Sequence, residues 1–472
     1  MYNSLIKTLL VAGFLYLFQT ALSQIRLPAV IGSNMVLQQK SNVSLWGWGG
    51  PGEKIYISTG WSNAIDSTIS TSDGWWKKTI QTPSAGGPYT IQLKGSNTIL
   101  LENVLIGEVW VCSGQSNMEW SAMNNNKQSL EEAPHATNSQ IRFFHMPRMT
   151  SDFPQDDCRA GWKVCNPEDM KRFSSIGYFF GKKLQAALQM PVGLINTSWG
   201  GTPAEVWTPR DVIESDKDLL EAANKISSNP WGPTTAGKTF NAMIAPITNY
   251  TIAGALWYQG ETNTGTAYMY SKLLKALISS WRQKWQKDFP FYFVQIAPFA
   301  YGTEYSGALL REAQTNTSSF PGTGMVVISD LVDDVNDIHP QNKSDVANRL
   351  ANLALAETYH KNTGAYKFPM YKNMTAEKGK IRIYFDNAEN GLTTKNGEAS
   401  DFIIAGADKI FYKATTKIEG ASVLVSAKEV KEPVAVRFGF KNRSIPNLFS
   451  KEGLPVNLFR TDDWNVGEFQ EK

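Results

Sequence analysis

The stretch VWVCSGQSNMEW, residues 109–120, joins an apolar run to a small polar cluster, and this break in hydrophobicity decides the fold. Residues 109–112 have the continuous apolar character of a strand that is buried on both faces of a parallel sheet. Ser116 stands just past the point where such a strand would end. A lone serine in this setting is usually a turn residue. Its meaning therefore depends on the residues at the ends of the other strands.

Strand-like apolar runs alternate with helical patterns over residues 105–365. VLIGEVWVC is followed along the chain by PVGLINTSW, TIAGALWYQ, FYFVQIAPF and GMVVISD, with helical patterns such as IGYFFGKKLQAAL and SKLLKALISSWRQKW between them. Five buried strands interleaved with helices predict an α/β domain, built as one open parallel sheet with helices on both faces. Ligands bind such sheets at the carboxyl ends of the strands.

Two β-rich regions flank this predicted catalytic domain. Residues 24–104 alternate with period two between Gly/Pro breaks, as in VSLWGWGGPGEKIYIS, and predict a β-sandwich-like accessory domain. Residues 366–472 return to the same style in KIRIYFDNAENGL and PVAVRFGFKN. This C-terminal β-rich region either folds separately or completes the first β domain.

Residues 1–23 have the features of a signal peptide, because Lys7 precedes the apolar run TLLVAGFLYLF and small residues precede Gln24. We therefore expect an exported protein, periplasmic or extracellular, without a membrane span in the mature chain. The 46 Lys and Arg residues nearly balance 43 Asp and Glu residues, and the resulting net charge of +3 gives no field for nucleic acid. The sequence settles neither the oligomeric state nor a pairing of Cys158 with Cys165.

Polar residues come after four of the five predicted strands: a serine, a glycine pair, an amide with a carboxylate in QGETN, and an Asp/His pair (Ser116; Gly200 and Gly201; Gln259; Asp337 and His339). These are the groups that acyl transfer needs, namely a nucleophile, oxyanion donors, and a base with an orienting carboxylate. Of the four histidines, His339 is the best candidate base, since neither His145 nor His360 has a carboxylate placed as a strand-end partner. No HExxH motif or His/carboxylate cluster is present, and we expect no metal and no other cofactor.

The motif blocks GQSNM, GGTPAEVW, QGETN and DIHP resemble, in this order, those of the SGNH (GDSL-like) esterases. The similarity is strongest to the sialate O-acetylesterase branch and its acetylxylan-esterase relatives, and GLPVNLFRTDDW near the C-terminus also resembles that branch. The resemblance implies a flavodoxin-like sheet that carries a serine esterase. It implies that Ser116 is the nucleophile and His339 the general base. It further implies an oxyanion hole made by the backbone N–H groups of Ser116 and of Gly200 or Gly201, with a side-chain donor from Gln259 or, less favoured, Asn263.

The acid that would orient His339 departs from the family pattern. Many SGNH enzymes place an aspartate three residues before the histidine, where this chain has Asn336. Asp337 stands two residues before His339, and Asp333 lies slightly further upstream. We take Asp337 as the acid, with Asp333 or a Ser-His dyad without an acid as the alternatives.

The resemblance and the strand-end residues together predict a serine esterase that removes O-acetyl groups from an acetylated carbohydrate. The expected substrate is 9-O-acetyl sialic acid. Acetylxylan or another acetylated plant glycan is the alternative, because the motifs specify acetyl transfer and not the sugar. A noncatalytic carbohydrate-binding protein is the alternative from a different functional class.

Overall fold

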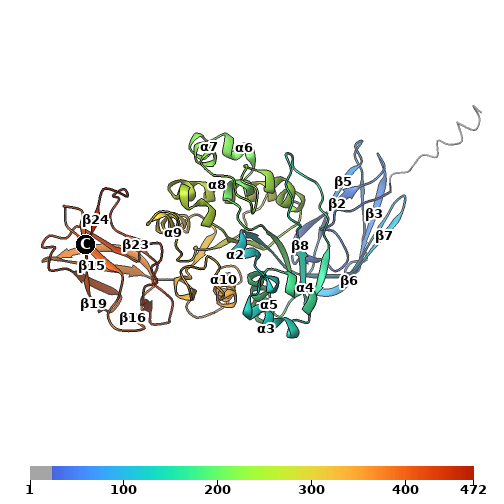
Figure 1. Cartoon of the computed structure of the whole chain (residues 1–472). Coiled ribbons are helices and arrows are strands. Elements are labelled where there is room, and N and C mark those ends of the chain that lie inside the picture. Colours follow the sequence, from blue (N-terminus) through green and yellow to red (C-terminus); the bar gives the residue numbers. More distant parts are fainter. Residues whose placement is uncertain (1–23) are drawn as a thin grey trace, which may run out of the picture.

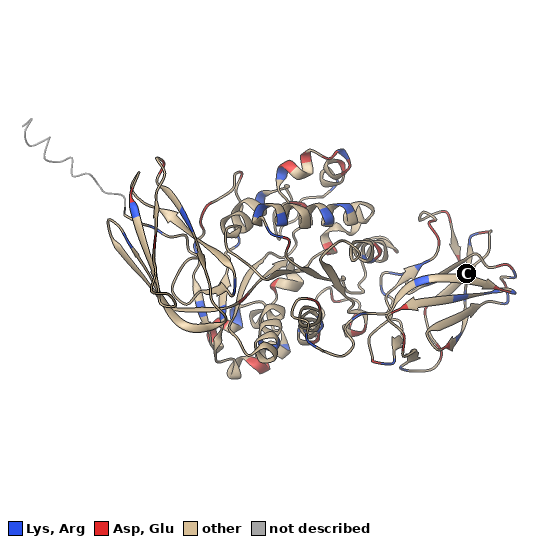
Figure 2. Cartoon of the chain, turned by 180° about the vertical axis from the view of Figure 1, so that it is seen from behind, with Lys and Arg blue, Asp and Glu red and all other residues tan. Residues whose placement is uncertain are grey.

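The computed structural model describes residues 24–472, so the predicted signal peptide of residues 1–23 lies outside the described residues. The chain forms three parts in a row: an N-terminal β region, a central α/β region and a C-terminal β region (Figure 1). Lys/Arg and Asp/Glu residues are interspersed over all three parts (Figure 2). This mixing agrees with the small net charge of +3.

The central sheet has the strands β7 (Thr98–Gly114), β8 (Asn138–His145), β9 (Trp162–Cys165), β10 (Val192–Ser198), β11 (Gly254–Tyr258), β12 (Phe291–Val294) and β13 (Thr323–Val326). Within residues 24–472, six of these strands run parallel in the order β8-β10-β7-β11-β12-β13, and β9 pairs antiparallel at the β8 edge. β7 comes first along the chain in this sheet. β8, β9 and β10 follow on one side of it, and β11, β12 and β13 then follow on the other. The end of β7 is therefore the topological switch point, where ligands bind in open α/β sheets.

The helices are α2 (Ser116–Glu119), α3 (Lys127–Glu132), α4 (Pro167–Arg172), α5 (Ser175–Leu188), α6 (Arg210–Glu214), α7 (Lys217–Asn224), α8 (Ala267–Trp285), α9 (Ser306–Thr317) and α10 (Lys343–Glu357). Helices α5 and α10 pack together on one face of the sheet, and α8 and α9 pack together on the other (Figure 1). The predicted parallel sheet with helices on both faces is confirmed. Ser174 caps α5 by accepting a hydrogen bond from Gly177 N–H, and the apolar face of that helix is buried.

The prediction of five parallel strands was one short, because β8 is a sixth. Its sequence NSQIRFFH begins with polar residues and has only a short apolar run, so it does not read as a buried strand. Pairing with β10 on one side and β9 on the other buries its second half. The neighbouring strands, and not the local pattern, make this segment a strand.

The N-terminal region has the strands β1 (Val36–Gln38), β2 (Asn42–Trp48), β3 (Lys54–Thr59), β4 (Ile65–Ile69), β5 (Trp75–Gln81) and β6 (Gly86–Lys94). The first half of β7 pairs antiparallel with β6, and its second half pairs parallel with β10 and β11. The expected boundary between residues 104 and 105 thus falls inside β7. One hydrophobic core runs through both regions, with buried side chains such as Trp46 and Trp76 in the β part and Trp110 and Trp257 in the α/β part.

The C-terminal region has the strands β14 (Met370–Glu377), β15 (Lys380–Asp386), β16 (Leu392–Thr394), β17 (Phe402–Ala405), β18 (Ile410–Lys413), β19 (Thr415–Glu419), β20 (Ser422–Ser426), β21 (Ala435–Phe438), β22 (Leu448–Ser450), β23 (Phe459–Arg460) and β24 (Gln470–Glu471). They pair with one another in sheets of order β14-β15-β20-β19, β23-β21-β17-β18-β24 and β16-β22. A separate hydrophobic core lies among them.

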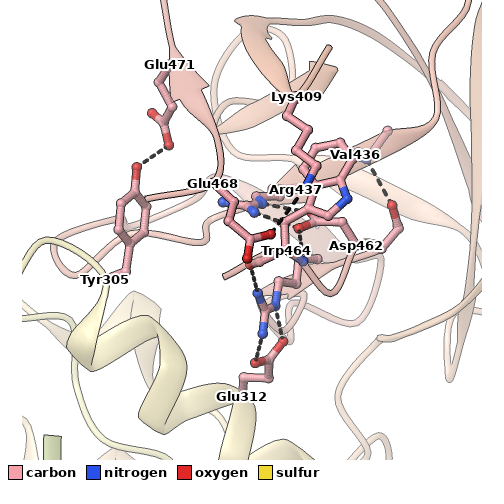
Figure 3. Close-up of polar contacts among 11 residues, drawn as sticks. Tyr305, Glu312, Lys409, Val436, Arg437, Asp462, Trp464, Glu468 and Glu471 are labelled. Atoms are coloured by element: carbon pink, nitrogen blue, oxygen red, sulfur yellow. Dashed lines mark hydrogen bonds and ion pairs between the residues drawn. The ribbon is translucent and has the colours of Figure 1, made fainter. Parts of the chain in front are cut away.

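The C-terminal region docks on α9 through polar contacts (Figure 3). Arg460 makes two hydrogen bonds, of 2.7 and 2.8 Å, to the carboxylate of Glu312 on α9. Behind this contact, the buried Arg437 guanidinium makes two hydrogen bonds to Asp462, at 2.8 and 2.6 Å. The same guanidinium lies 3.8 Å from the ring centre of Phe469. In the motif FRTDDW, Arg460 therefore contacts the central region, and Asp462 pairs with Arg437 inside the C-terminal region.

The three cysteines, Cys112, Cys158 and Cys165, are free thiols. Cys112 is fully buried in β7, and burial raises the pKa of its thiol to about 12. Among residues 24–472, no helix has the length and apolar character that crossing a membrane requires.

Candidate active site

Ser116 lies two residues after the end of β7, as the first residue of α2, with Gln115 between them. Gly114 makes this exit possible, because its φ is +134° and a Cβ there would lie 2.1 Å from the carbonyl oxygen of Tyr258. β7 therefore stays in register with β11 up to its last residue and turns sharply after it. This turn delivers the Ser116 hydroxyl to the carboxyl edge of the sheet, where it lines a cavity.

His339 meets Ser116 across 223 residues of sequence, with its Nε2 2.9 Å from the Ser116 Oγ. The imidazole ring is stacked on Trp120, with the ring centres 4.2 Å apart and the planes 19° from parallel. Burial lowers the pKa of His339 to about 4, the positive charge of Lys343 acts in the same direction, and Asp337 opposes both effects. The ring is therefore neutral at pH 7 and can accept the proton of a hydroxyl group.

Asp337 lies near His339 without a hydrogen bond to its ring. The distance from Asp337 Oδ1 to His339 Nδ1 is 3.8 Å, which is too long for a hydrogen bond. The same oxygen accepts the backbone N–H of His339 at 2.8 Å instead. The alternative acid, Asp333, is exposed, and among residues 24–472 no hydrogen bond or ion pair joins it to His339.

Gly200 and Gly201 both line the cavity beside Ser116. A Cβ at Gly200 would lie 3.2 Å from the Cβ of Ser116, so the backbone passes close to the hydroxyl. The Gly200 N–H donates to Glu119 Oε2 at 2.8 Å, and the other oxygen of Glu119 accepts from Arg148 Nε at 2.6 Å. A carboxylate thus accepts the Gly200 N–H, which is one of the two alternative glycine donors that the family resemblance implies for the oxyanion hole. The sequence pattern contains no signal for this contact.

Gln259 does not face Ser116, although the sequence places it at the same edge of the sheet. Its side chain is completely buried, and its Nε2 donates to Thr202 O at 3.2 Å and to Asn263 Oδ1 at 2.7 Å. Both amide hydrogens are therefore used. Asn263 is engaged too, since its Nδ2 donates to both carboxylate oxygens of Glu205, at 3.1 and 2.9 Å. Neither amide is free to donate to an oxyanion at Ser116, contrary to the expectation from the sequence.

No role was predicted from the sequence for three buried polar residues that lie beside the Ser116–His339 pair. Asn117 Nδ2 donates to Glu261 Oε1 at 2.6 Å and to the carbonyl of Ile338 at 3.0 Å. Lys343 Nζ donates to Asn117 Oδ1 at 2.6 Å. Asn117 and Glu261 belong to the motifs GQSNM and QGETN and were within reach of motif reasoning, whereas nothing near Lys343 in the sequence marks it.

The cavity at this edge has a volume of about 820 Å³ and extends well beyond the serine. Trp231 forms part of its wall and is 71% exposed. The other lining residues mix aromatic, polar and charged side chains, among them Trp120, Asn124, Arg148, Asn229, Thr262 and His339. In the described part of the chain, no group of three or more His, Cys, Asp or Glu residues is arranged to hold a metal ion.

Comparisons with known proteins relate this chain to esterases. Residues 106–356 match the family described as "Carbohydrate esterase, sialic acid-specific acetylesterase". The sialate O-acetylesterase of Rattus norvegicus is 29% identical over 413 residues, which span 74% of this chain and 76% of the rat protein. The sialate O-acetylesterase of Homo sapiens is 28% identical over 406 residues, which span 76% of each chain. The crystal structure of a carbohydrate acetylesterase from Xanthomonas citri superposes with a TM-score of 0.85 at 34% identity, over 93% of this chain and 100% of that one.

Proposed function

This chain belongs to the sialic acid-specific acetylesterase family of carbohydrate esterases and is a carboxylic ester hydrolase, and we propose that Ser116 and His339 remove O-acetyl groups from sialic acid. The observation that carries the assignment of the two residues is the 2.9 Å contact between Ser116 Oγ and His339 Nε2 at the wall of the cavity. A nucleophile within hydrogen-bond distance of a neutral base is the arrangement that acyl transfer requires.

In the proposed reaction, Ser116 Oγ attacks the acetyl carbonyl carbon while His339 Nε2 accepts the hydroxyl proton. The tetrahedral intermediate collapses, the C–O bond to the sugar breaks, and His339 returns the proton to the departing sugar hydroxyl. Water then attacks the acetyl-serine with His339 again as the base. Acetate leaves, and Ser116 regains its proton.

The oxyanion of the intermediate is assigned to the backbone N–H groups of Ser116 and Gly200 or Gly201. Gly200 N–H is bonded to Glu119 in the free protein, so it can serve the oxyanion only after that carboxylate moves away. The other carboxylate oxygen of Glu119 accepts a hydrogen bond from Arg148 Nε at 2.6 Å. Each oxyanion donor is typically worth about 10²–10³ in rate.

Replacing Ser116 by alanine tests the proposal. We expect acetate release from O-acetyl sialic acid to fall by at least about 10⁴-fold, while the circular dichroism spectrum and thermal unfolding stay unchanged. The matched control is Ser62→Ala, since Ser62 stands in the similar sequence GWSNA but lies in the N-terminal β region. Substantial turnover by the Ser116 variant would contradict the assignment.

The second candidate substrate is an acetylated plant glycan such as acetylxylan. A cavity of about 820 Å³ with the exposed Trp231 in its wall favours a ligand longer than one sugar, because aromatic faces stack on sugar rings. Acetate release from 9-O-acetyl sialic acid and from acetylated xylo-oligosaccharides, measured in parallel, separates the two substrates. A kcat/KM that is at least tenfold higher for the xylo-oligosaccharides would overturn the sialate assignment while leaving the esterase chemistry intact.

We further propose that the protein is exported, to a periplasm or the extracellular space, after cleavage before Gln24. The support is the charged and apolar pattern of residues 1–23. Mass spectrometry of the protein recovered outside the cytoplasm should show Gln24 as the first residue. Recovery of the chain from the cytoplasm with residues 1–23 still attached would contradict export.

A further inference from the structure

A chain of three buried polar side chains lies beside the Ser116–His339 pair. It runs from the Lys343 ammonium to the Asn117 amide and on to the Glu261 carboxylate, with both hydrogen bonds 2.6 Å long. All three side chains are at least 94% buried, since their exposed fractions are 1%, 0% and 6% respectively. Buried charge without a function is costly to keep. None of these groups takes part in the proposed reaction itself, so their role has to lie elsewhere.

The Asn117 amide holds the segment that carries His339 on both sides of the ring. Asn117 directly follows Ser116 on α2, and its Nδ2 donates to the carbonyl of Ile338, the residue before His339, at 3.0 Å. Its Oδ1 accepts from Lys343, at the start of α10 just after His339. Glu261 anchors the amide from the start of the 3₁₀ helix that follows β11. One side chain next to the nucleophile thus fixes the base at two points.

We call the hydrogen-bonded set of Asn117, Lys343 and Glu261 the clamp. It matters for the position of His339 because the usual hydrogen bond from an acid to the ring Nδ1 is missing. Asp337 Oδ1 lies 3.8 Å from His339 Nδ1 and accepts the backbone N–H instead. Within residues 24–472, the contacts that hold the ring are therefore the stack on Trp120 and the bond to Ser116. The place of the ring relative to Ser116 then depends on the backbone of its own segment, and Asn117 sets that backbone.

The clamp also brings charge to the base. Two charged groups face His339, the Asp337 carboxylate and the Lys343 ammonium, whose Nζ lies 5.5 Å from the centre of the Trp120 ring on which His339 is stacked, and Glu261 in turn faces Lys343. Burial lowers the pKa of Lys343 to about 7 and raises that of Glu261. Below pH 7, Lys343 therefore carries a positive charge that opposes protonation of the neighbouring imidazole.

We propose that Asn117, Lys343 and Glu261 are positioning residues, which set the distance between Ser116 and His339 and keep the base free of its proton. This inference rests on the proposed roles of Ser116 and His339. Within residues 24–472, no hydrogen bond joins these three side chains to Ser116 Oγ, and we infer that they act through the backbone and the charge around His339.

The test uses Lys343→Met, Glu261→Gln and the double variant, with kcat and KM measured from pH 3.5 to pH 9 on 4-nitrophenyl acetate. For Lys343→Met we expect kcat to fall at least about tenfold with KM changed less than about threefold, because uniform binding is not touched. Loss of the positive charge near His339 should raise the pKa of its imidazole. The acid limb of kcat/KM, where activity falls as this imidazole is protonated, should therefore move to higher pH by on the order of one unit.

Glu261→Gln separates position from charge. Glutamine can still accept the Asn117 N–H, but it removes the negative charge that faces the Lys343 ammonium. We expect kcat to fall because this buried charge is left unpaired, while the acid limb moves less than in Lys343→Met because Lys343 stays in place. The double variant leaves no unpaired buried charge. We therefore expect its fold-loss in kcat to be smaller than the product of the fold-losses of the two single variants.

Lys287→Met is the matched control. Lys287 Nζ also donates a hydrogen bond to one oxygen atom, the backbone carbonyl of Ile252 at 2.7 Å. Lys287 lies between α8 and β12, away from the carboxyl edge of the sheet. We expect its kcat/KM to stay within about twofold of the wild type.

The inference is overturned if Lys343→Met matches Lys287→Met in kcat and keeps the acid limb of the wild type. Should the single lysine variant not fold, the double variant takes its place, and an unchanged acid limb there overturns the inference equally. Failure of the underlying function gives a different result, namely an active Ser116→Ala variant.

Discussion

Replacing Asp337 by asparagine asks whether this carboxylate is the third member of a catalytic triad. In a triad the acid binds the ring N–H at Nδ1, and its loss costs about 10⁴ in kcat. Here the Asp337 oxygen lies 3.8 Å from Nδ1 and is bonded to the backbone N–H of His339. Asparagine keeps an oxygen for that N–H and removes only the charge.

The size of the effect depends on the distance and the exposure. Two unit charges 3.8 Å apart attract by about 4 kcal/mol at an effective dielectric constant near 20, and by about 1 kcal/mol in water. The side chains of His339 and Asp337 are 25% and 46% exposed, so solvent screening places the interaction at the lower end, about 1–2 kcal/mol. Asp337→Asn should therefore lower kcat by only about 5–30-fold.

The assay is kcat for acetate release at pH 7, together with the pH profile of kcat/KM. Asp337 raises the pKa of His339, so its removal lowers that pKa and the acid limb should move to lower pH. This direction is opposite to that expected for Lys343→Met. Asp333→Asn is the control, because Asp333 is exposed and should leave both measurements unchanged. A loss near 10⁴ for Asp337→Asn would refute the reasoning and show that the working enzyme uses a triad.

Two further predictions concern a buried ion pair inside the C-terminal region and the cavity wall. Arg437→Met removes one partner of a fully buried ion pair and should lower the free energy of unfolding by about 3–5 kcal/mol in urea titrations, whereas Lys78→Met, in an exposed pair, should leave the curve nearly unchanged. An unaltered curve for the arginine variant would contradict a structural role for the buried pair. Trp231→Ala should raise KM for acetylated oligosaccharides by about 3–10-fold with little change in kcat, through loss of one aromatic contact, and should leave 4-nitrophenyl acetate hydrolysis as it is. Equal KM values of the wild type and the Trp231 variant for the oligosaccharides would exclude a contact between Trp231 and the sugar.

The sequence by itself determined the class of the fold and the two residues that meet at its edge. Apolar runs of strand length alternate with helical patterns, and this alternation leaves a covered parallel sheet as the arrangement that buries them. Because parallel strands end at one edge, the residues after β7 and β13 lie on the same side of the sheet, and the segment after β13 crosses the ends of β12 and β11 to reach Ser116. The contact between Ser116 and His339 is a consequence of that geometry.

The tertiary structure alone decided where each side chain at that edge points. Gln259 follows its strand as expected, yet its amide is used up by Thr202 and Asn263, and Gly200 N–H is taken by Glu119. Competition among nearby donors and acceptors settles such contacts, and the competitors come from distant parts of the chain. For the same reason the buried Lys343 left no mark in the local sequence. Its partners, Asn117 and Glu261, reach it only once α2, β11 and α10 are packed together.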